Sequence, residues 1–302
     1  MKDKKLEANL SMVASRIMSG LNMNALKFLL PLWMGALTGV TVRCLFAAVA
    51  FWITGCFVHE APTTRRQRWG LFCLGAFGLY GFLFCFLLGI SKTTPVSSAI
   101  FNSMQPIWVF LISVVLLQEK ATLMKIVGIA LGFGGALLCI LTQGSDDLAH
   151  DALTGNVLCL LSSIVFAIYL IVSKRLLQKV GVVTLMKYVF GGAAVSGLVV
   201  SSIAGWDAAM FSDALRGEWH WMPWAVLAFV LVFPTYLSYF LVPIGLKYLK
   251  TTVVAIYSYL ILVVTTITSL SLGQDRFTWT QAVAIGLICI SVYFVEMAEK
   301  RS

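Results

Sequence analysis

The fold is decided by residues 88–140, which read LGISKTTPVSSAIFNSMQPIWVFLISVVLLQEKATLMKIVGIALGFGGALLCI. Two continuous apolar runs, 95–117 and 124–142, meet here at a short polar turn. Each run has about the length that an α-helix needs to cross the hydrocarbon core of a bilayer, which is roughly 20 residues. The runs do not alternate between apolar and polar residues, so they predict helices and not the strands of a membrane barrel.

Eight more apolar segments flank this pair, and together they predict an all-α membrane protein with ten transmembrane helices. The composition agrees, since 60% of the 302 residues are apolar and 12% are charged, whereas soluble domains carry about 25% charged residues. This excludes a soluble enzyme, and it leaves almost no solvated face for nucleic acid despite the net charge of +9. The expected partners are the lipid bilayer and a small-molecule substrate. The ten predicted segments are 9–28, 32–57, 69–90, 95–117, 124–142, 155–174, 181–204, 221–243, 251–272 and 279–297.

The second half of the chain repeats the first. Residues 89–140, shifted by 156 positions, align without gaps on residues 245–296, and the polar turn 118–120 falls on 274–276. Five segments per half is an odd number, so the second half must enter the membrane upside down. Inverted repeats are typical of secondary transporters, which bind substrate near the midplane between the two halves.

The basic residues predict the orientation of the chain. With ten spans and an inner N-terminus, 15 of the 22 Lys and Arg residues fall on the inner side, 4 on the outer side and 3 within spans. The positive-inside rule then predicts both termini in the cytoplasm and the loop 205–220 outside. We expect a multi-pass protein of the inner (plasma) membrane.

The stretch quoted above resembles the EamA domain of the drug/metabolite transporter superfamily. The likeness lies in the small residues that open segment 95–117, its polar middle with Pro106, the acidic turn at Glu119, and the glycine-rich segment 124–142. The arginine at position 43 also resembles a feature of that family.

The resemblance extends over nearly the whole chain, because residues 155–177 resemble the start of the family's second repeat. It implies two inverted five-helix EamA repeats, 9–142 and 155–297, which form a permease that moves a small organic metabolite by alternating access without ATP. The first segment, 9–28, departs from the family by being unusually polar.

Arg43 is the first candidate for substrate binding. It lies about 12 residues from the outer end of its segment and about 14 from the inner end, or roughly 18–21 Å at helical rise. A central arginine costs about 2.5–3.5 kcal/mol on insertion, so its guanidinium must face protein or water. Arg43 either anchors a substrate carboxylate or phosphate, or it is a structural arginine that binds carbonyls at helix ends.

A polar stripe in segment 95–117 is the second candidate. Ser98, Asn102 and Gln105 share one helical face. Pro106 interrupts the backbone hydrogen bonds beside them, and Trp108 lies in mid-segment. The stripe predicts either a polar pocket with an aromatic wall or hydrogen bonds that join helices. Further candidates of the same character are Tyr169, Tyr236, Tyr239, Tyr257 and Ser258.

Two other basic residues lie within segments, Arg16 and Lys187, each about six or seven residues from the inner end. Both are close enough to extend to the interface, and we predict that they do so. Arg16 nevertheless shares a helical face with Gly20, Asn24 and Lys27, and that face must line a cavity or another helix.

The only Asp or Glu inside a predicted segment is Glu296, near the cytoplasmic end of segment 279–297. The chain has no Walker loop, no nucleophile beside a base, and no metal-binding spacing. We therefore expect a protein that is not an enzyme, with no catalytic residue, no metal and no cofactor. An exported amino acid or related amphiphilic solute fits the aromatic, amide and arginine side chains. A phosphorylated or sugar-linked anion is the alternative, and a non-transporting sensor or an intramembrane enzyme is the alternative of a different class. The sequence leaves the oligomeric state open.

Overall fold

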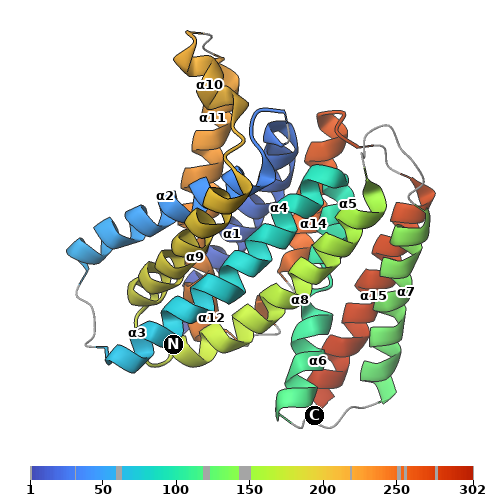
Figure 1. Ribbon diagram of the computed structural model, residues 1–302. Helices are drawn as coiled ribbons and strands as arrows, with labels where there is room; N and C mark the ends of the chain where they lie inside the picture. The colour runs from blue at the N-terminus through green and yellow to red at the C-terminus, as the bar shows by residue number, and fades with distance from the viewer. Residues whose placement is uncertain are drawn as a thin grey trace.

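The computed structural model describes residues 2–30, 32–58, 63–117, 123–142, 151–217, 220–249, 253–254, 257–275 and 278–301. All regular secondary structure in these ranges is helical, and two of the elements, η1 and η2, are π-helical (Figure 1). The elements are α1 Lys2–Leu29, α2 Ala36–Phe57, α3 Arg65–Cys73, η1 Leu74–Leu79, α4 Tyr80–Lys92, α5 Pro95–Asn102, α6 Gln105–Leu117, α7 Leu123–Thr142, α8 Ala152–Leu177, α9 Val182–Ala204, α10 Ala209–Leu215, α11 Trp221–Val230, η2 Leu231–Leu237, α12 Ser238–Tyr248, α14 Ser258–Ser271 and α15 Trp279–Arg301.

Within these ranges, five helical rods are long and apolar enough to cross a membrane. They are α2, the continuous rod α3–η1–α4, α8, α9 and the continuous rod α11–η2–α12. Helical residues also occupy the other five predicted segments, but there the apolar helices are shorter or more polar. The structure therefore confirms an all-helical membrane architecture, while the count of ten crossings stays a prediction.

The predicted segment 95–117 is divided into two helices, α5 and α6. The α5 helix starts with Pro95 at its first position, after Thr94, whose hydroxyl accepts a hydrogen bond from the Ser97 amide. It ends before the turn at Ser103, and Pro106 then lies in the first turn of α6, where a missing N–H costs no helical hydrogen bond.

The shift of 156 positions also relates the helix bounds. Arg65–Lys92 and Trp221–Tyr248 are rods of 28 residues each, and the same shift brings one onto the other. Their π-helical elements, η1 and η2, correspond to within one or two residues at each end. Likewise α7 begins at Leu123 and α15 at Trp279. The internal repeat thus extends well beyond the aligned stretch.

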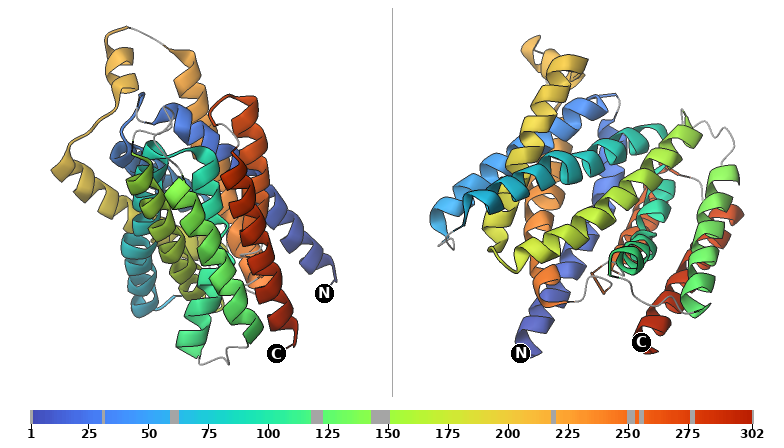
Figure 2. Two further views of the ribbon diagram at one scale, coloured as in Figure 1. Left: turned by 90° about the vertical axis from the view of Figure 1, so that its right-hand side faces the viewer. Right: turned by 60° about the horizontal axis from the view of Figure 1, so that its bottom comes forward.

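Corresponding rods run in opposite directions. In Figure 1, α3 lies towards the end that carries both chain termini and α4 leads away from it. The α11 helix starts beside α10 at the far end, and α12 leads back. Figure 2 also shows the two termini at one end and opposite α10. This is the arrangement expected of inverted repeats.

Equivalent helices make equivalent contacts where the two halves meet. The α1 helix packs against α12 and α14, and α8 packs in the same way against α4 and α6. The pairs α2–α9 and α7–α15 join corresponding helices directly. Where α9 crosses η1, Gly75 and Gly192 allow backbone contact, since a Cβ on either would meet a carbonyl group, of Val189 or of Phe72.

Candidate functional site

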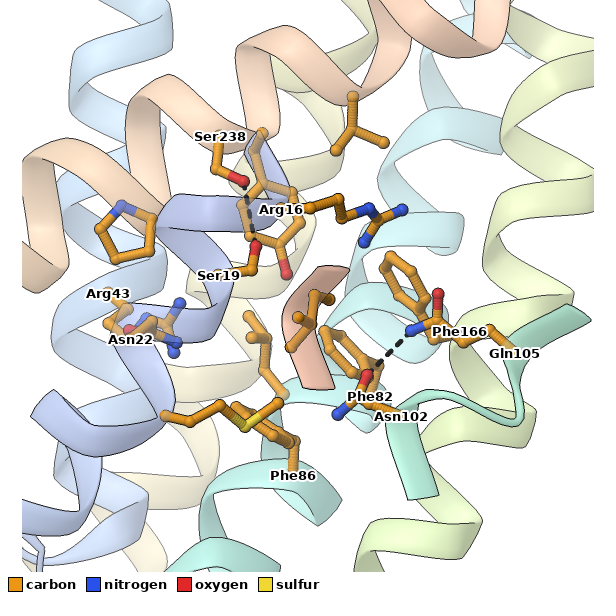
Figure 3. Close-up of a pocket in the computed structure, with 16 residues that line it drawn as sticks. Arg16, Ser19, Asn22, Arg43, Phe82, Phe86, Asn102, Gln105, Phe166 and Ser238 are labelled. Atoms are coloured by element: carbon orange, nitrogen blue, oxygen red, sulfur yellow. Dashed lines mark hydrogen bonds between the residues drawn. The ribbon is translucent and has the colours of Figure 1, made fainter. Parts of the chain in front are cut away.

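A cavity of about 510 Å³, a volume that includes its opening, lies between helices of the two halves (Figure 3). The space within it that is open to the centre of a water-sized sphere is about 50 Å³. Among the described residues, its lining combines two arginines, polar amides, hydroxyls and aromatic rings, and it contains no carboxylate. The lining residues are Arg16, Ser19, Asn22, Met23, Arg43, Phe82, Leu83, Phe86, Asn102, Gln105, Phe166, Pro234, Ser238, Tyr239, Val242 and Ile261.

Arg43 reaches this cavity from α2, and only 3% of its surface is exposed. Its Nε donates a hydrogen bond of 2.8 Å to Oγ1 of Thr235, which lies in η2. Its Nη1 is buried and has no hydrogen-bond partner among the residues that the structure describes. The hydrogen bond to Thr235 is with a side-chain hydroxyl of the opposite half, and the guanidinium keeps donors for a ligand.

Arg16 enters the same cavity from α1. The prediction that it extends to the interface is wrong, because α1 begins at Lys2 and places Arg16 in mid-helix, where it is 3% exposed. Its Nη2 donates a long hydrogen bond of 3.4 Å to the carbonyl of Val254, and its Nε is buried with no partner within the described ranges. Tyr239, also on the cavity wall, lies within electrostatic range of both arginines.

The break between α5 and α6 presents two amides to the cavity. Gln105 donates a hydrogen bond of 2.8 Å from Nε2 to Oδ1 of Asn102, and both residues are buried. Neither the Oε1 of Gln105 nor the Oδ1 of Asn22 on α1 has a hydrogen-bond partner among the described residues. The cavity therefore offers unfilled acceptors as well as unfilled cationic donors, and a bound solute with both kinds of group would satisfy them.

Three phenylalanines form the aromatic side of the cavity (Figure 3). Phe82 and Phe86 come from one face of α4, with ring centroids 5.7 Å apart. Phe166 of α8 packs on Phe82 at 4.5 Å. The phenyl surface suits the apolar part of an amphiphilic solute. Phe82 and Phe86 could not be predicted from the sequence, because nothing in an apolar run marks a phenylalanine that faces a cavity.

Four of the predicted binding residues line the cavity together: Arg43, Asn102, Gln105 and Tyr239. Tyr169 lies behind them, since its ring stacks on Phe166 at 5.7 Å.

Trp108, Tyr236, Tyr257 and Ser258 are not among the cavity's lining residues. Trp108 packs edge-on against Phe133 at 5.0 Å. The Tyr236 hydroxyl bonds Oγ1 of Thr54 at 2.7 Å, and Tyr257 donates a hydrogen bond of 3.0 Å to Oδ1 of Asn9. Ser258 is buried at the start of α14. Their binding roles stay predictions.

A second set of polar contacts lies at the end of the molecule opposite the termini, and one of them joins the two halves. The Nζ of Lys27 donates a hydrogen bond of 2.7 Å to the carbonyl of Thr93. A carboxylate oxygen of Asp275 accepts a hydrogen bond of 3.2 Å from the Val96 amide, in the first turn of α5. Asp275 therefore binds a backbone amide at the start of a helix of the other half. Its repeat mate Glu119 lies outside the described residues.

A family model matches both halves of the chain. The model of the EamA-like transporter family matches residues 6–141 and again residues 153–297. The chain belongs to the EamA-like transporter family. With its apolar helical rods, this EamA-like protein is a multi-pass membrane transporter.

Proteins of similar sequence are also described as transporters. The EamA-like chain is 24% identical to the uncharacterized transporter YyaM of Bacillus subtilis, over 69% of this chain and 67% of YyaM. It is 24% identical to the uncharacterized transporter YetK of the same bacterium, over 86% of this chain and 78% of YetK. An uncharacterized transporter of Archaeoglobus fulgidus is 27% identical over 53% of this chain and 54% of its own length.

The fold of this EamA-like protein is also found in a solved crystal structure. The two superpose with a TM-score of 0.65 over 99% of this chain and 100% of the other, at 15% sequence identity. At that identity the likeness concerns the fold alone.

Proposed function

We propose that this protein is a secondary transporter that exports an amino acid, or a related amphiphilic solute, by alternating access without ATP. In this proposal the termini lie in the cytoplasm and the cavity between the halves is the substrate site. The proposal is supported by the cavity's position between inverted halves, which is where such transporters bind their solutes.

The observation that carries the proposal is the buried Nη1 of Arg43, which has no partner within the described residues. A guanidinium binds a carboxylate through two parallel hydrogen bonds, and these are stronger than bonds between neutral groups. An empty cavity leaves this donor unsatisfied at a cost of about 1–3 kcal/mol or more, because it is charged. A substrate carboxylate removes this cost.

The unfilled acceptors favour a solute that also carries N–H groups. The amide oxygens of Asn22 and Gln105 are buried and have no hydrogen-bond partner in the part of the chain that the structure describes. In our proposal they accept hydrogen bonds from the ammonium group of an amino acid, while the phenyl rings of Phe82, Phe86 and Phe166 contact its side chain.

A second candidate substrate is a phosphorylated or sugar-linked anion. It is favoured by the presence of a second cation, Arg16, in the same cavity, with no carboxylate among the described lining residues. Arginine binds phosphate oxygens as well as it binds carboxylates.

Uptake into proteoliposomes tests the proposal. The purified protein is reconstituted, and counterflow of radiolabelled amino acids, organic acids and sugar phosphates is measured. We expect Arg43→Gln to lower kcat/KM at least about tenfold, and Arg43→Lys to restore little, because an ammonium cannot bind a carboxylate bidentately. Arg175→Gln, on an exposed arginine in the last turn of α8, is the control and should transport at the native rate.

Normal insertion with native transport by Arg43→Gln would show that Arg43 does not anchor the solute. Binding of a solute without counterflow would favour the sensor over the transporter, and chemical conversion of the solute would favour the intramembrane enzyme.

A further inference from the structure

The cavity holds more positive charge than one carboxylate can neutralise. Arg16 and Arg43 come from different helices, α1 and α2, and each is 3% exposed. Figure 3 shows their guanidinium groups on different sides of the cavity. No Asp or Glu is among the described lining residues, so the protein side chains around the cavity supply no counter-charge.

Each guanidinium group has N–H donors that make no hydrogen bond to the described residues. Arg43 uses its Nε on Thr235, and Arg16 uses its Nη2 on Val254 at the long distance of 3.4 Å. The buried Nη1 of Arg43 and the buried Nε of Arg16 have no hydrogen-bond partner in the described part of the chain. A guanidinium has five N–H groups, and buried cations are stabilised only when they are paired. Two separate cationic groups are therefore incompletely paired in one cavity.

A solute with a single carboxylate would pair one arginine and leave the other unpaired. A zwitterion without a second acid would also bring its ammonium group into a site with two positive charges. A solute with two separated acid groups pairs both arginines, and the amide oxygens of Asn22 and Gln105 remain for its N–H groups.

We propose that the transported solute carries two separated carboxylates, one bound by Arg43 and the other by Arg16, as in an amino dicarboxylate or a small dicarboxylic acid. This inference rests on the proposed function, since it takes the cavity as the substrate site. Arg16 is then the residue that selects for the second acid group.

Matched pairs of solutes test this selection, because an amide has nearly the shape of a carboxylate without its charge. The pairs are glutamate and glutamine, aspartate and asparagine, and succinate and succinamate. Counterflow is measured for each solute, and binding is measured by the shift of the thermal unfolding midpoint in detergent. We expect the wild-type protein to prefer the dicarboxylate in at least one pair by about tenfold or more in kcat/KM.

The Arg16→Gln variant should reduce that preference to within about twofold, while its kcat/KM for the monoamide changes less than about threefold. Arg16→Lys keeps the charge and should keep part of the preference, which controls for misfolding. Lys187→Gln removes a cation that lies on the ring of Trp52, with 4.4 Å from Nζ to the centroid, and not on the cavity wall, so the preference should persist.

Three results would each overturn the inference. The first is an equal kcat/KM of the wild-type protein for both members of every pair, and the second is that no dicarboxylate binds. The third is that Arg16→Gln lowers kcat/KM equally for both members of a pair. Uptake of a monocarboxylate that depends on Arg43 would leave the proposed function standing in all these cases. Uptake of sugar phosphates alone would instead support the second candidate substrate.

Discussion

Arg43 and Thr235 join the two halves of the protein by a hydrogen bond of 2.8 Å from Nε to Oγ1. Arg43 belongs to α2 in the first half, and Thr235 belongs to the π-helical element η2 in the second. Thr235 is fully buried. The direction of the guanidinium in the cavity therefore depends on the backbone conformation of a helix in the other half.

Replacing Thr235 by valine should weaken substrate binding. Valine keeps the branched shape but lacks the hydroxyl acceptor, and a hydrogen bond from a charged donor contributes about 1.5–3 kcal/mol. We expect the KM for the transported solute to rise about tenfold or more, with little change in the amount of folded protein. Thr268→Val, which removes a hydroxyl bonded within α14, is the matched control. An unchanged KM in Thr235→Val would show that the bond does not orient Arg43.

Two adjacent glycines in α9 should respond differently to the same substitution. A Cβ at Gly192 would collide with the carbonyl of Phe72, whereas a Cβ at Gly191 would meet only the Trp52 ring nitrogen at 3.9 Å. We expect Gly192→Ala to destabilise the protein by about 1–3 kcal/mol, as overpacking does, and Gly191→Ala to be neutral or stabilising by up to about 1 kcal/mol. Thermal unfolding in detergent gives both values. Equal midpoints for the two variants would contradict the close α9–η1 crossing.

The ion pair between Lys92 and Asp151 should make a pH-dependent contribution to stability. Asp151 precedes α8, and its carboxylate accepts hydrogen bonds from Lys92 at 3.0 Å and from the Thr154 amide, which lower the pKa of this carboxyl. Because the folded pKa lies below the unfolded value of about 3.9, the contribution is present above that pH and is lost as the pH falls through the folded pKa. Asn can replace the helix cap but not the charge.

We therefore expect Asp151→Asn to have a slightly lower unfolding midpoint than the wild-type protein at pH 7, and the difference to shrink as the pH falls below about 4. Both side chains are substantially exposed, so the effect should be small and should shrink in high salt. A difference that persists unchanged at pH 3 would assign it to packing and not to charge.

The orientation in the membrane can be tested by labelling cysteines from outside intact cells. The seven natural cysteines are first replaced. We expect Asp213→Cys, in the short helix α10, to be labelled and Arg66→Cys, at the start of α3, to be protected, because basic residues favour the cytoplasmic side. The structure places α10 at the end opposite both termini (Figure 2). The reverse labelling pattern would invert the predicted topology.

Transport should not depend on a proton gradient. Transport that is coupled to protons uses a buried carboxylate, which binds either a proton or the substrate. No carboxylate is among the described residues that line the cavity. We expect facilitated diffusion or exchange, with equal solute concentrations reached in proteoliposomes at zero membrane potential. Uphill accumulation driven by a pH gradient alone would refute this expectation and would indicate that a carboxylate elsewhere, such as Asp275, reaches the pathway.

The sequence predicted the helical class, the repeat and the central arginine, because bilayer thickness and the cost of a buried charge act on the chain locally. It did not predict which helical face each residue presents. Tyr236 and Tyr239 are three positions apart, yet one contacts Thr54 and the other lines the cavity. Arg16 was misplaced because helix α1 begins at Lys2, well before the apolar run. Such faces and ends are set by neighbouring helices, which a single segment does not specify.

The two π-helical elements allow the rods that contain them a motion that an unbroken α-helix does not allow. A π-turn contains one residue more than an α-turn, so moving the turn along the rod rotates the side chains it passes by about 100° while the rod keeps nearly the same length. In η2 such a slip would carry Thr235 away from Arg43. In η1 the equivalent shift of the π-turn would act on a rod that runs in the direction opposite to the rod that contains η2. Screw-like rotation, and not bending, is thus the motion that the paired rods make available, and spin labels on their faces would report it.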